Sequence, residues 1–234
     1  MSRSILITGA ARGLGLCFAK KYLKDGFMVF AGTRDLEAPK LKDLQREYPN
    51  AFLPVELEVT DTESVAAAAR TVRSYTEKLD LIINNAAVHN STSFEVLEKA
   101  DLDDCLKVYG INSLGPLRVV KGFLPFLRNN PGAKVINISS ESGSISTCGR
   151  EKEFDYCMSK AALNMASKML SNYLRKDQII VLAVHPGWMR TDMGGGNAAL
   201  DPYETACKLA DLFETRNDPD GPGFIDNQGN EYPW

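Results

Sequence analysis

The sequence predicts an α/β fold, a single-domain doubly wound parallel sheet of about seven strands with helices on both faces. Short apolar runs rich in Val, Ile and Leu alternate with longer amphipathic runs along the whole chain. That alternation is typical of buried parallel strands joined by helices. The 234 residues are enough for one self-sufficient core, so we expect one domain over residues 1–234.

Each strand is predicted from a short apolar run. These runs cover residues 4–8, 28–32, 51–57, 79–84, 134–138 and 179–184, with a last short strand near 223–225. Helices are predicted from the amphipathic stretches between the strands. They cover residues 13–25, 38–47, 61–77, 101–128, 155–176 and 202–215. We expect the fourth helix to break near Gly110 or Gly115, and Asp201-Pro202 marks the start of the last one.

Composition and charge exclude several classes of function. The net charge of −3 and the lack of a long basic run disfavour a nucleic-acid partner. No apolar run reaches the ~18 residues of a membrane span, and we expect no leader segment before the first strand. Five cysteines without a CxxC pair indicate reduced thiols and a cytoplasmic location, and two histidines without a ligand spacing indicate no metal site.

The turn after the first predicted strand carries glycines at positions 9, 13 and 15. Such a turn directs main-chain N–H groups and the positive end of a helix toward a phosphate. The strict G-x-G-x-x-G fingerprint is not met, because Phe18 stands at the place of the third glycine. A tight turn whose glycines serve packing alone is the alternative. We favour a Rossmann-type dinucleotide site.

The residues after the second predicted strand indicate which nucleotide is bound. An acid there would hold the ribose 2′-OH of NAD, but Thr33 occupies that place and Arg34 follows it. Arg12 lies in the glycine loop, and two guanidiniums suit a 2′-phosphate. The alternative is that both arginines are solvated surface charges, and Asp35 could pair with Arg34 or turn toward the next helix. We therefore expect NADP(H) in preference to NAD(H).

Tyr156 and Lys160 are four residues apart in a predicted helix, so their side chains share one face. A lysine ammonium beside a phenol favours the phenolate, and we expect it to lower the pKa of Tyr156 from about 10. A tyrosine so adjusted exchanges a proton with a carbonyl or alcohol oxygen. This pair also recurs by chance on many helices, so the interpretation depends on the order of the other motifs.

That order is Thr8-Gly9-x-x-x-Gly13-x-Gly15, Asn84-Asn85-Ala86, a Ser-Ser strand end, Tyr-x-x-x-Lys and Pro-Gly. The chain resembles the short-chain dehydrogenase/reductase family over its whole length. The resemblance implies a catalytic set of Asn112, Ser140, Tyr156 and Lys160, with Ser139 as the alternative serine.

In that set the serine would hold the substrate carbonyl and Tyr156 would donate the proton. Lys160 would bind ribose hydroxyls and lower the pKa of Tyr156. Asn112 would fix a water for proton return, or it would satisfy main-chain groups at a helix kink. Ser140 precedes Tyr156 by sixteen residues, a slightly longer loop than the family has.

The resemblance also implies cofactor contacts along the chain. The expected cofactor-binding residues are Gly9, Arg12, Gly13, Leu14, Gly15, Arg34, Glu58, Val59, Asn85, Ala86, Ala87, Tyr156, Lys160, Pro186, Gly187, Met189 and Thr191. Glu58 and Ala87 depart from the family's Asp and Gly. Trp188 is expected to bind substrate with Ser140 and Tyr156, or else to pack in the core, and His185 is expected to be packed or capped.

Three functions follow from these residues. The leading one is NADPH-dependent reduction of a small aldehyde, ketone or quinone. The second is an NAD(P)-binding signalling protein with little turnover, because the run 191–195 and the ending 229–234 resemble a subgroup that contains such a protein. The third is another reaction on the same scaffold, such as dehalogenation or epimerisation. We expect a homodimer or homotetramer formed through helices 101–128 and 155–176, and the sequence does not identify the substrate.

Overall fold

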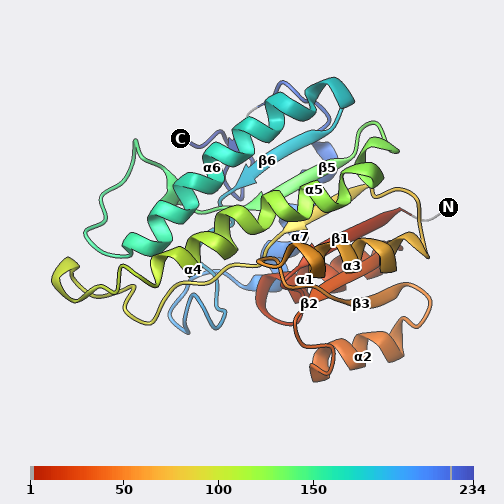
Figure 1. Cartoon of the computed structure of the whole chain (residues 1–234), viewed down its shortest axis with the longest axis horizontal. Helices are drawn as coiled ribbons and strands as arrows, with labels where there is room; N and C mark the ends of the chain where they lie inside the picture. The colour runs from red at the N-terminus through yellow and green to blue at the C-terminus, as the bar shows by residue number, and fades with distance from the viewer. Residues whose placement is uncertain (1–2, 222) are drawn as a thin grey trace.

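The computed structural model describes residues 3–221 and 223–234. One parallel sheet of seven strands runs through the molecule in the order β3-β2-β1-β4-β5-β6-β7 (Figure 1). In that order the strands are β3 (Phe52–Glu56), β2 (Met28–Thr33), β1 (Ser4–Thr8), β4 (Leu81–Asn84), β5 (Lys134–Ile138), β6 (Ile180–Val184) and β7 (Phe224–Ile225). The predicted doubly wound α/β fold is confirmed.

Helices cover both faces of the sheet because each strand alternates its side chains between them. Ile5 and Ile7 of β1 pack with α1 (Gly13–Lys24), α2 (Pro39–Glu47) and α7 (Pro202–Thr215). Leu6, between them, faces the core under α3 (Thr62–Arg73), α5 (Gly115–Arg128) and α6 (Phe154–Leu174). In Figure 1 these last three helices cross the front of the sheet.

The chain reverses its direction of winding between β1 and β4, where the strand order passes from early to late elements. In open α/β sheets, ligands bind at the carboxyl ends of the strands beside such a reversal. The glycine loop follows β1, the Asn-Asn-Ala segment follows β4, and the Ser-Ser pair follows β5. The fold therefore brings three of the sequence motifs to one edge of the sheet.

The long predicted helix 101–128 is interrupted, as expected from its glycines. It consists of α4 (Cys105–Tyr109), a π-helical turn (Gly110–Leu114) and α5. Residues 101–104 are not helical, and the Asp101 carboxylate accepts the main-chain N–H groups of Asp103 and Asp104 before α4 begins. Gly115 leaves room for Val59, whose Cγ2 would lie 2.9 Å from a Cβ at that position. The kink thus sits where the helix presses against the sheet.

Candidate active site

The glycine loop is shaped by close main-chain contacts. Gly9 and Gly13 have φ of +65° and +54°, a region that glycine adopts without strain. A Cβ on Gly15 would lie 2.4 Å from the Gly9 carbonyl oxygen and 2.6 Å from Asn85 Nδ2. Asn85 donates to the carbonyls of Thr8 and Gly9 at 3.0 and 3.2 Å. The predicted Asn-Asn-Ala motif therefore holds the loop in place.

The loop also fits a phosphate. The helix α1 starts at Gly13, and within residues 3–221 and 223–234 no side chain caps its amino end. The first N–H groups of a helix need an acceptor, and a phosphate oxygen supplies one. Packing alone explains Gly9 and Gly15, whereas a Cβ on Gly13 would meet only the Thr191 side chain, at 3.6 Å. The geometry suits the pyrophosphate of a dinucleotide.

The two arginines predicted for the 2′-phosphate lie at the surface, each beside an acid. Arg12 pairs with Asp192 at 2.9 Å, with both side chains more than 70% exposed. Arg34 lies 3.6 Å from Glu58. Asp35 does not take Arg34 as its partner, because it accepts the N–H of Glu37 at 2.9 Å and so follows the chain toward α2.

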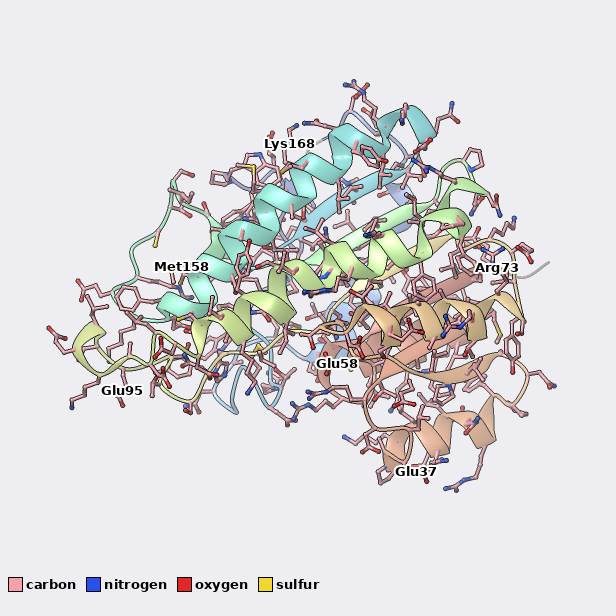
Figure 2. All side chains as sticks on the ribbon, viewed as in Figure 1. Glu37, Glu58, Arg73, Glu95, Met158 and Lys168 are labelled. Carbon is pink, nitrogen blue, oxygen red and sulfur yellow. The ribbon has the colours of Figure 1, made fainter. Side chains whose placement is uncertain are left out.

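Glu58 stands where β3 leads into α3 (Figure 2). Its carboxylate accepts the Thr60 N–H and hydroxyl at 2.9 and 2.8 Å. Burial acts to raise the pKa of Glu58, but the contacts with Thr60 and Arg34 outweigh it, so the pKa lies below its usual value. The side chain is ionised and held at the sheet edge, and its contact with a nucleotide base stays a prediction.

The two adjacent serines after β5 have different surroundings. Ser139 donates to Asn164 Oδ1 at 2.6 Å and is thereby tied to α6. Ser140 donates to Glu141 Oε2 at 2.7 Å and lies beside Tyr156, whose pKa its hydroxyl acts to lower. Only Ser140 faces the tyrosine, which favours it over Ser139 as the serine that meets a substrate.

Tyr156 and Lys160 lie together on α6. Lys160 Nζ is 5.4 Å from the Tyr156 ring centroid and donates to the Ile138 carbonyl at 2.7 Å. Lys160 is 2% exposed, and burial lowers its pKa to about 7. Burial, followed by the charge of Glu141, raises the pKa of Tyr156. The expected lowering is wrong for this structure, because burial and the charge of Glu141 outweigh the Ser140 hydrogen bond and the charge of Arg150, which act to lower the pKa.

Asn112 lies in the π-helical turn before α5. Its amide exchanges two hydrogen bonds with the main chain of Val88, at 2.8 and 2.9 Å, and donates to Ser159 Oγ at 2.9 Å. At the kink, one side chain therefore contacts both the chain after β4 and the helix α6. Asn112 does satisfy main-chain groups, but those of Val88 after β4 and not those of the kink, and its part in a water relay stays a prediction.

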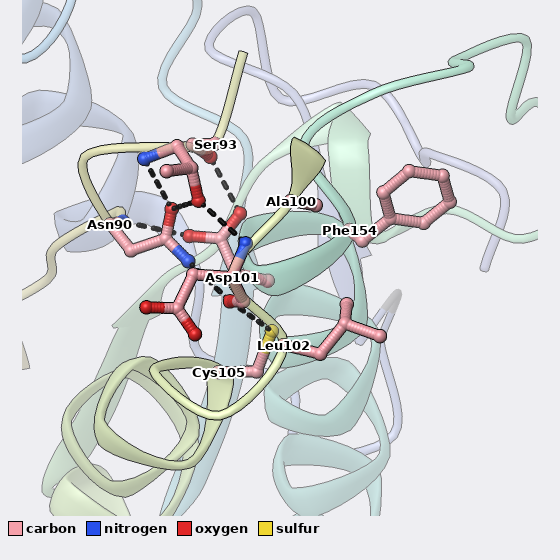
Figure 3. A pocket seen from close by; sticks show the side chains of 9 residues that line it. Asn90, Ser93, Ala100, Asp101, Leu102, Cys105 and Phe154 are labelled. Carbon is pink, nitrogen blue, oxygen red and sulfur yellow. Dashed lines mark hydrogen bonds between the residues drawn. The ribbon is translucent and has the colours of Figure 1, made fainter. Parts of the chain in front are cut away.

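A second polar cluster fixes the start of α6 next to Tyr156. Asp155 is 3% exposed and accepts Asn90 N–H at 2.8 Å and Ser93 Oγ at 2.6 Å. Figure 3 shows Asn90 and Ser93 close together in the segment after β4, with Phe154 to one side. Glu153 N–H donates to the Ser93 carbonyl at 2.8 Å. Asp155 thereby ties the segment after β4 to the helix that carries Tyr156.

Comparison with known proteins identifies the family. A family model described as short chain dehydrogenase matches residues 3–199. The chain belongs to this family. It is an oxidoreductase of the NAD(P)-binding short-chain dehydrogenase type.

Three similar proteins extend this result. C-signal of Myxococcus xanthus is 37% identical over 159 residues, which cover 68% of this chain and 95% of that protein. The NADPH-bound carbonyl reductase from chicken fatty liver is 33% identical with a TM-score of 0.91, covering 100% of this chain and 99% of the other. The carbonyl reductase Sniffer of D. melanogaster is 28% identical with a TM-score of 0.92 and complete coverage of both chains.

The loop after β6 approaches the glycine loop of this dehydrogenase. Thr191 lies near Gly13, and its hydroxyl accepts Gly194 N–H at 3.1 Å. Trp188 is 59% exposed and donates from Nε1 to the Gly194 carbonyl at 2.8 Å, so packing in the core is wrong for it. Met189 is partly buried against the core. The loop lies where it could cover a bound dinucleotide.

The remaining residues predicted to bind the cofactor differ in how deeply they are buried. Leu14, Val59 and Pro186 are buried, so a cofactor could meet little beyond their main chain. Ala86 and Ala87 are half-buried. Gly187, with φ of +85°, turns the chain out of β6. Their contacts with a nucleotide stay predictions of the dehydrogenase family resemblance.

Sequence reasoning missed the group around Glu141. Its carboxylate lies 3.2 Å from His185 Nδ1 and contacts Arg150, and its N–H donates to His185 Nδ1 at 3.1 Å. Burial acts to raise the pKa of Glu141, but Ser140, His185 and Arg150 outweigh it and lower the pKa. His185 packs its ring on Tyr232, as expected of a packed histidine, and burial lowers its pKa. The strands β5 and β6 are neighbours in the sheet. The predicted strand order could therefore have indicated that Glu141, after β5, lies near His185, after β6.

No described helix is both long and apolar enough to cross a membrane. Among residues 3–221 and 223–234, no three His, Cys, Asp or Glu side chains are grouped as a metal ion would require.

Proposed function

We propose that this dehydrogenase is an NADPH-dependent carbonyl reductase acting on a small aldehyde, ketone or quinone. The observation that carries the proposal is the grouping of Ser140, Tyr156 and Lys160, with Lys160 Nζ 5.4 Å from the Tyr156 ring. One domain over residues 1–234 would hold both cofactor and substrate. The likeness to two carbonyl reductases supports the reaction class.

Within this proposal each side chain has a distinct role. NADPH supplies a hydride when it is bound. The Ser140 hydroxyl would turn from Glu141 to the substrate oxygen, and the carboxylate left behind keeps the contacts of His185 and Arg150. Tyr156 gives its proton to the same oxygen. A raised pKa keeps Tyr156 protonated near neutral pH, which is the form that reduction consumes.

The preference for NADPH rests on charge at one corner of the site. Arg12 and Arg34 are exposed, one in the glycine loop and the other after the end of β2. The last residue of β2 is Thr33, so no carboxylate stands there to bind a ribose 2′-OH. The NADPH in the chicken reductase structure supports the same choice. A fluorescence titration should give a clearly lower Kd for NADPH than for NADH, and removal of Arg34 should narrow the difference.

The reaction is tested by following NADPH oxidation with a panel of aldehydes, ketones and quinones. Activity on at least one class, lost in Tyr156→Phe, is the expected result. If the native protein and Tyr156→Phe give the same rate as no enzyme on every compound while both bind NADPH, carbonyl reduction is the wrong function.

A signalling role is the second candidate, favoured by the 37% identity to C-signal. It would use the same nucleotide site with little turnover. Restoration of a cellular phenotype by Tyr156→Phe as fully as by the native protein would favour this role, and failure of the variant would favour the enzyme.

We also propose a cytoplasmic homodimer or homotetramer. All five cysteines are free, which suits a reducing compartment. The outer face of α6 exposes Met158, Met165, Met169 and Tyr173, each by more than half, and Figure 2 shows Met158 on this helix. Apolar side chains in such a row suit a helix-packing interface. Light scattering should give a multiple of 25.7 kDa and a smaller mass for Met165→Glu.

A further inference from the structure

The last four residues, 231–234, fold back over the catalytic end of the sheet, and we call them the C-terminal tail. Glu231 forms an antiparallel bridge with Ile225 of β7, and Tyr232 N–H donates to the Phe224 carbonyl at 2.9 Å. The tail is therefore attached to the sheet edge next to the strands that carry the catalytic serine and His185.

The tail makes its first contact with the loop that follows Ser140, residues 144–153, which we call the substrate loop. The Trp234 main-chain oxygen accepts three hydrogen bonds: from Ser146 N–H at 3.1 Å, Ser146 Oγ at 2.6 Å and Ser144 Oγ at 3.3 Å. The Trp234 ring lies 5.4 Å from the Phe224 ring, and Gly223 leaves room for it. An aromatic anchor on β7 thus holds a main-chain acceptor against the loop.

A second contact leads to the catalytic serine itself. The Tyr232 ring lies 5.6 Å from the His185 ring and 5.2 Å from Phe224. His185 Nδ1 accepts the Glu141 N–H at 3.1 Å, and the Glu141 carboxylate accepts the Ser140 hydroxyl at 2.7 Å. Tyr232 therefore packs against the histidine that fixes the turn carrying Ser140. The tail therefore holds the segment 140–146 at both ends: directly at Ser146, and through His185 at Ser140.

We propose that the C-terminal tail is a positioning element of the reductive site, which fixes Ser140 and the substrate loop and so sets the shape of the carbonyl pocket. This inference rests on the proposed function. The nucleotide site has no part in it, because the tail's hydrogen bonds and ring contacts named above are with β7, His185 and the substrate loop. We therefore expect the tail to act on substrate binding first, because none of the contacts named above is with a predicted cofactor-binding residue; the nearest of these, Pro186, follows His185 directly.

The first test compares the full-length protein with deletion of 232–234 and with Trp234→Ala. Loss of the tail's contacts predicts a KM for the carbonyl substrate raised about tenfold in the deletion variant, which corresponds to about 1.4 kcal/mol. The Kd for NADPH should stay unchanged, and kcat should fall less than KM rises. Trp234→Phe keeps an aromatic ring on Phe224 and should restore most of the native KM.

The matched control is Gln228→Ala, in the turn before the tail. Its side chain is exposed and forms no hydrogen bond within the described part of the chain, so native KM and kcat are expected. A purely structural effect would lower the melting temperature, raise the Kd for NADPH and raise the KM for the carbonyl substrate together. A parallel loss of NADPH affinity and substrate affinity in Trp234→Ala would overturn the proposal.

A double-mutant cycle tests the contact itself. Ser144→Ala with Ser146→Ala removes the two hydroxyl donors to the Trp234 carbonyl, and it should raise KM in the native background but have little further effect in the deletion variant. Fully additive effects would mean that serines and tail act separately, which contradicts the proposal.

The last arm needs no activity, so it separates this inference from the proposed function. Arg150 and Lys152 place two trypsin sites inside the substrate loop. The deletion variant should be cut there about tenfold faster than the native protein, while Gln228→Ala is cut at the native rate. Unchanged cleavage of the loop refutes the tail's role even if carbonyl reduction is established. Faster cleavage supports the role even if no carbonyl compound is reduced.

Discussion

The nucleotide end and the catalytic end of the site are built on opposite principles. At the nucleotide end the charged groups stand in water, as in the Arg12–Asp192 pair with both side chains more than 70% exposed. At the catalytic end Lys160 is 2% exposed, and its environment lowers its pKa to about 7. Water screens the first set, whereas burial changes the chemistry of the second. We therefore expect steric changes to matter most at the proposed nucleotide end and changes of ionisation at the proposed catalytic end.

The largest effect is expected where a single proton donor is removed. Tyr156→Phe deletes only the phenolic hydroxyl, and general acid catalysis is typically worth 10²–10⁴-fold, so kcat should fall by about that factor. NADPH affinity, measured by fluorescence, should change little. Tyr75→Phe, an exposed tyrosine beside Phe30, is the control and should leave the rate unchanged. Loss of less than tenfold in Tyr156→Phe would assign the proton to another group.

At the nucleotide end, the strongest change is steric. A methyl group on Gly15 would lie 2.4 Å from the Gly9 carbonyl oxygen, so Gly15→Ala must displace the loop. Overpacking of this kind costs about 1–3 kcal/mol, and we expect a matching loss of stability and an NADPH Kd raised at least about tenfold.

Gly26→Ala is the matched control for Gly15. Gly26 has φ of +80°, and a Cβ added there would meet nothing within 4 Å, so the variant suffers backbone strain alone. Its unfolding free energy should fall while the NADPH Kd stays native. Equal Kd values in the two variants would contradict the steric account of the glycine loop.

These two ends also differ in how far the sequence predicted them. The strands 4–8 and 134–138, the helix 202–215 and the break in helix 101–128 follow from apolar periodicity and glycine, and the structure has them at those places. The glycine loop and Tyr156–Lys160 follow from short local patterns.

The group of Glu141, His185 and Arg150 could not be predicted from a local pattern, because its members come from three separate segments. The direction of the Tyr156 pKa was predicted wrongly for the same reason. A pattern four residues long indicates which groups are neighbours, but the depth of burial depends on the whole fold.

The buried lysine gives the next effect, a dependence of stability on pH. The pKa of Lys160 is about 7 in the folded protein and about 10.4 in an unfolded chain. Between these values the unfolded state binds more protons, so stability rises with pH from 7 to about 10 by up to about 1.4 kcal/mol per unit.

Lys160→Met lacks this contribution and serves as the reference. We would measure urea unfolding of both proteins at pH 7, 8 and 9 with nucleotide removed. The unfolding free energy of the native protein should rise relative to that of the variant at each step in pH. A constant difference over that range would mean that Lys160 keeps an ordinary pKa and that the two ends of the site are less different than the burial of Lys160 implies.

The smallest effect is expected at the exposed pair of Arg12 and Asp192. The two side chains join the glycine loop to the loop after β6 at 2.9 Å, and a 2′-phosphate bound by Arg12 would have to replace Asp192. Asp192→Asn removes this competitor, so NADPH should bind more tightly by a factor of about two to five, the range of exposed ion pairs.

NADH, which lacks the 2′-phosphate, should bind Asp192→Asn and the native protein equally, and the gain for NADPH should shrink in 1 M salt. Asp43→Asn breaks a comparable surface pair with Arg46 on α2 and should leave both affinities native. Weaker NADPH binding by Asp192→Asn would show that Asp192 orients Arg12 toward the phosphate instead of competing with it. The surface charges of the nucleotide end would then be as organised as the buried groups of the catalytic end.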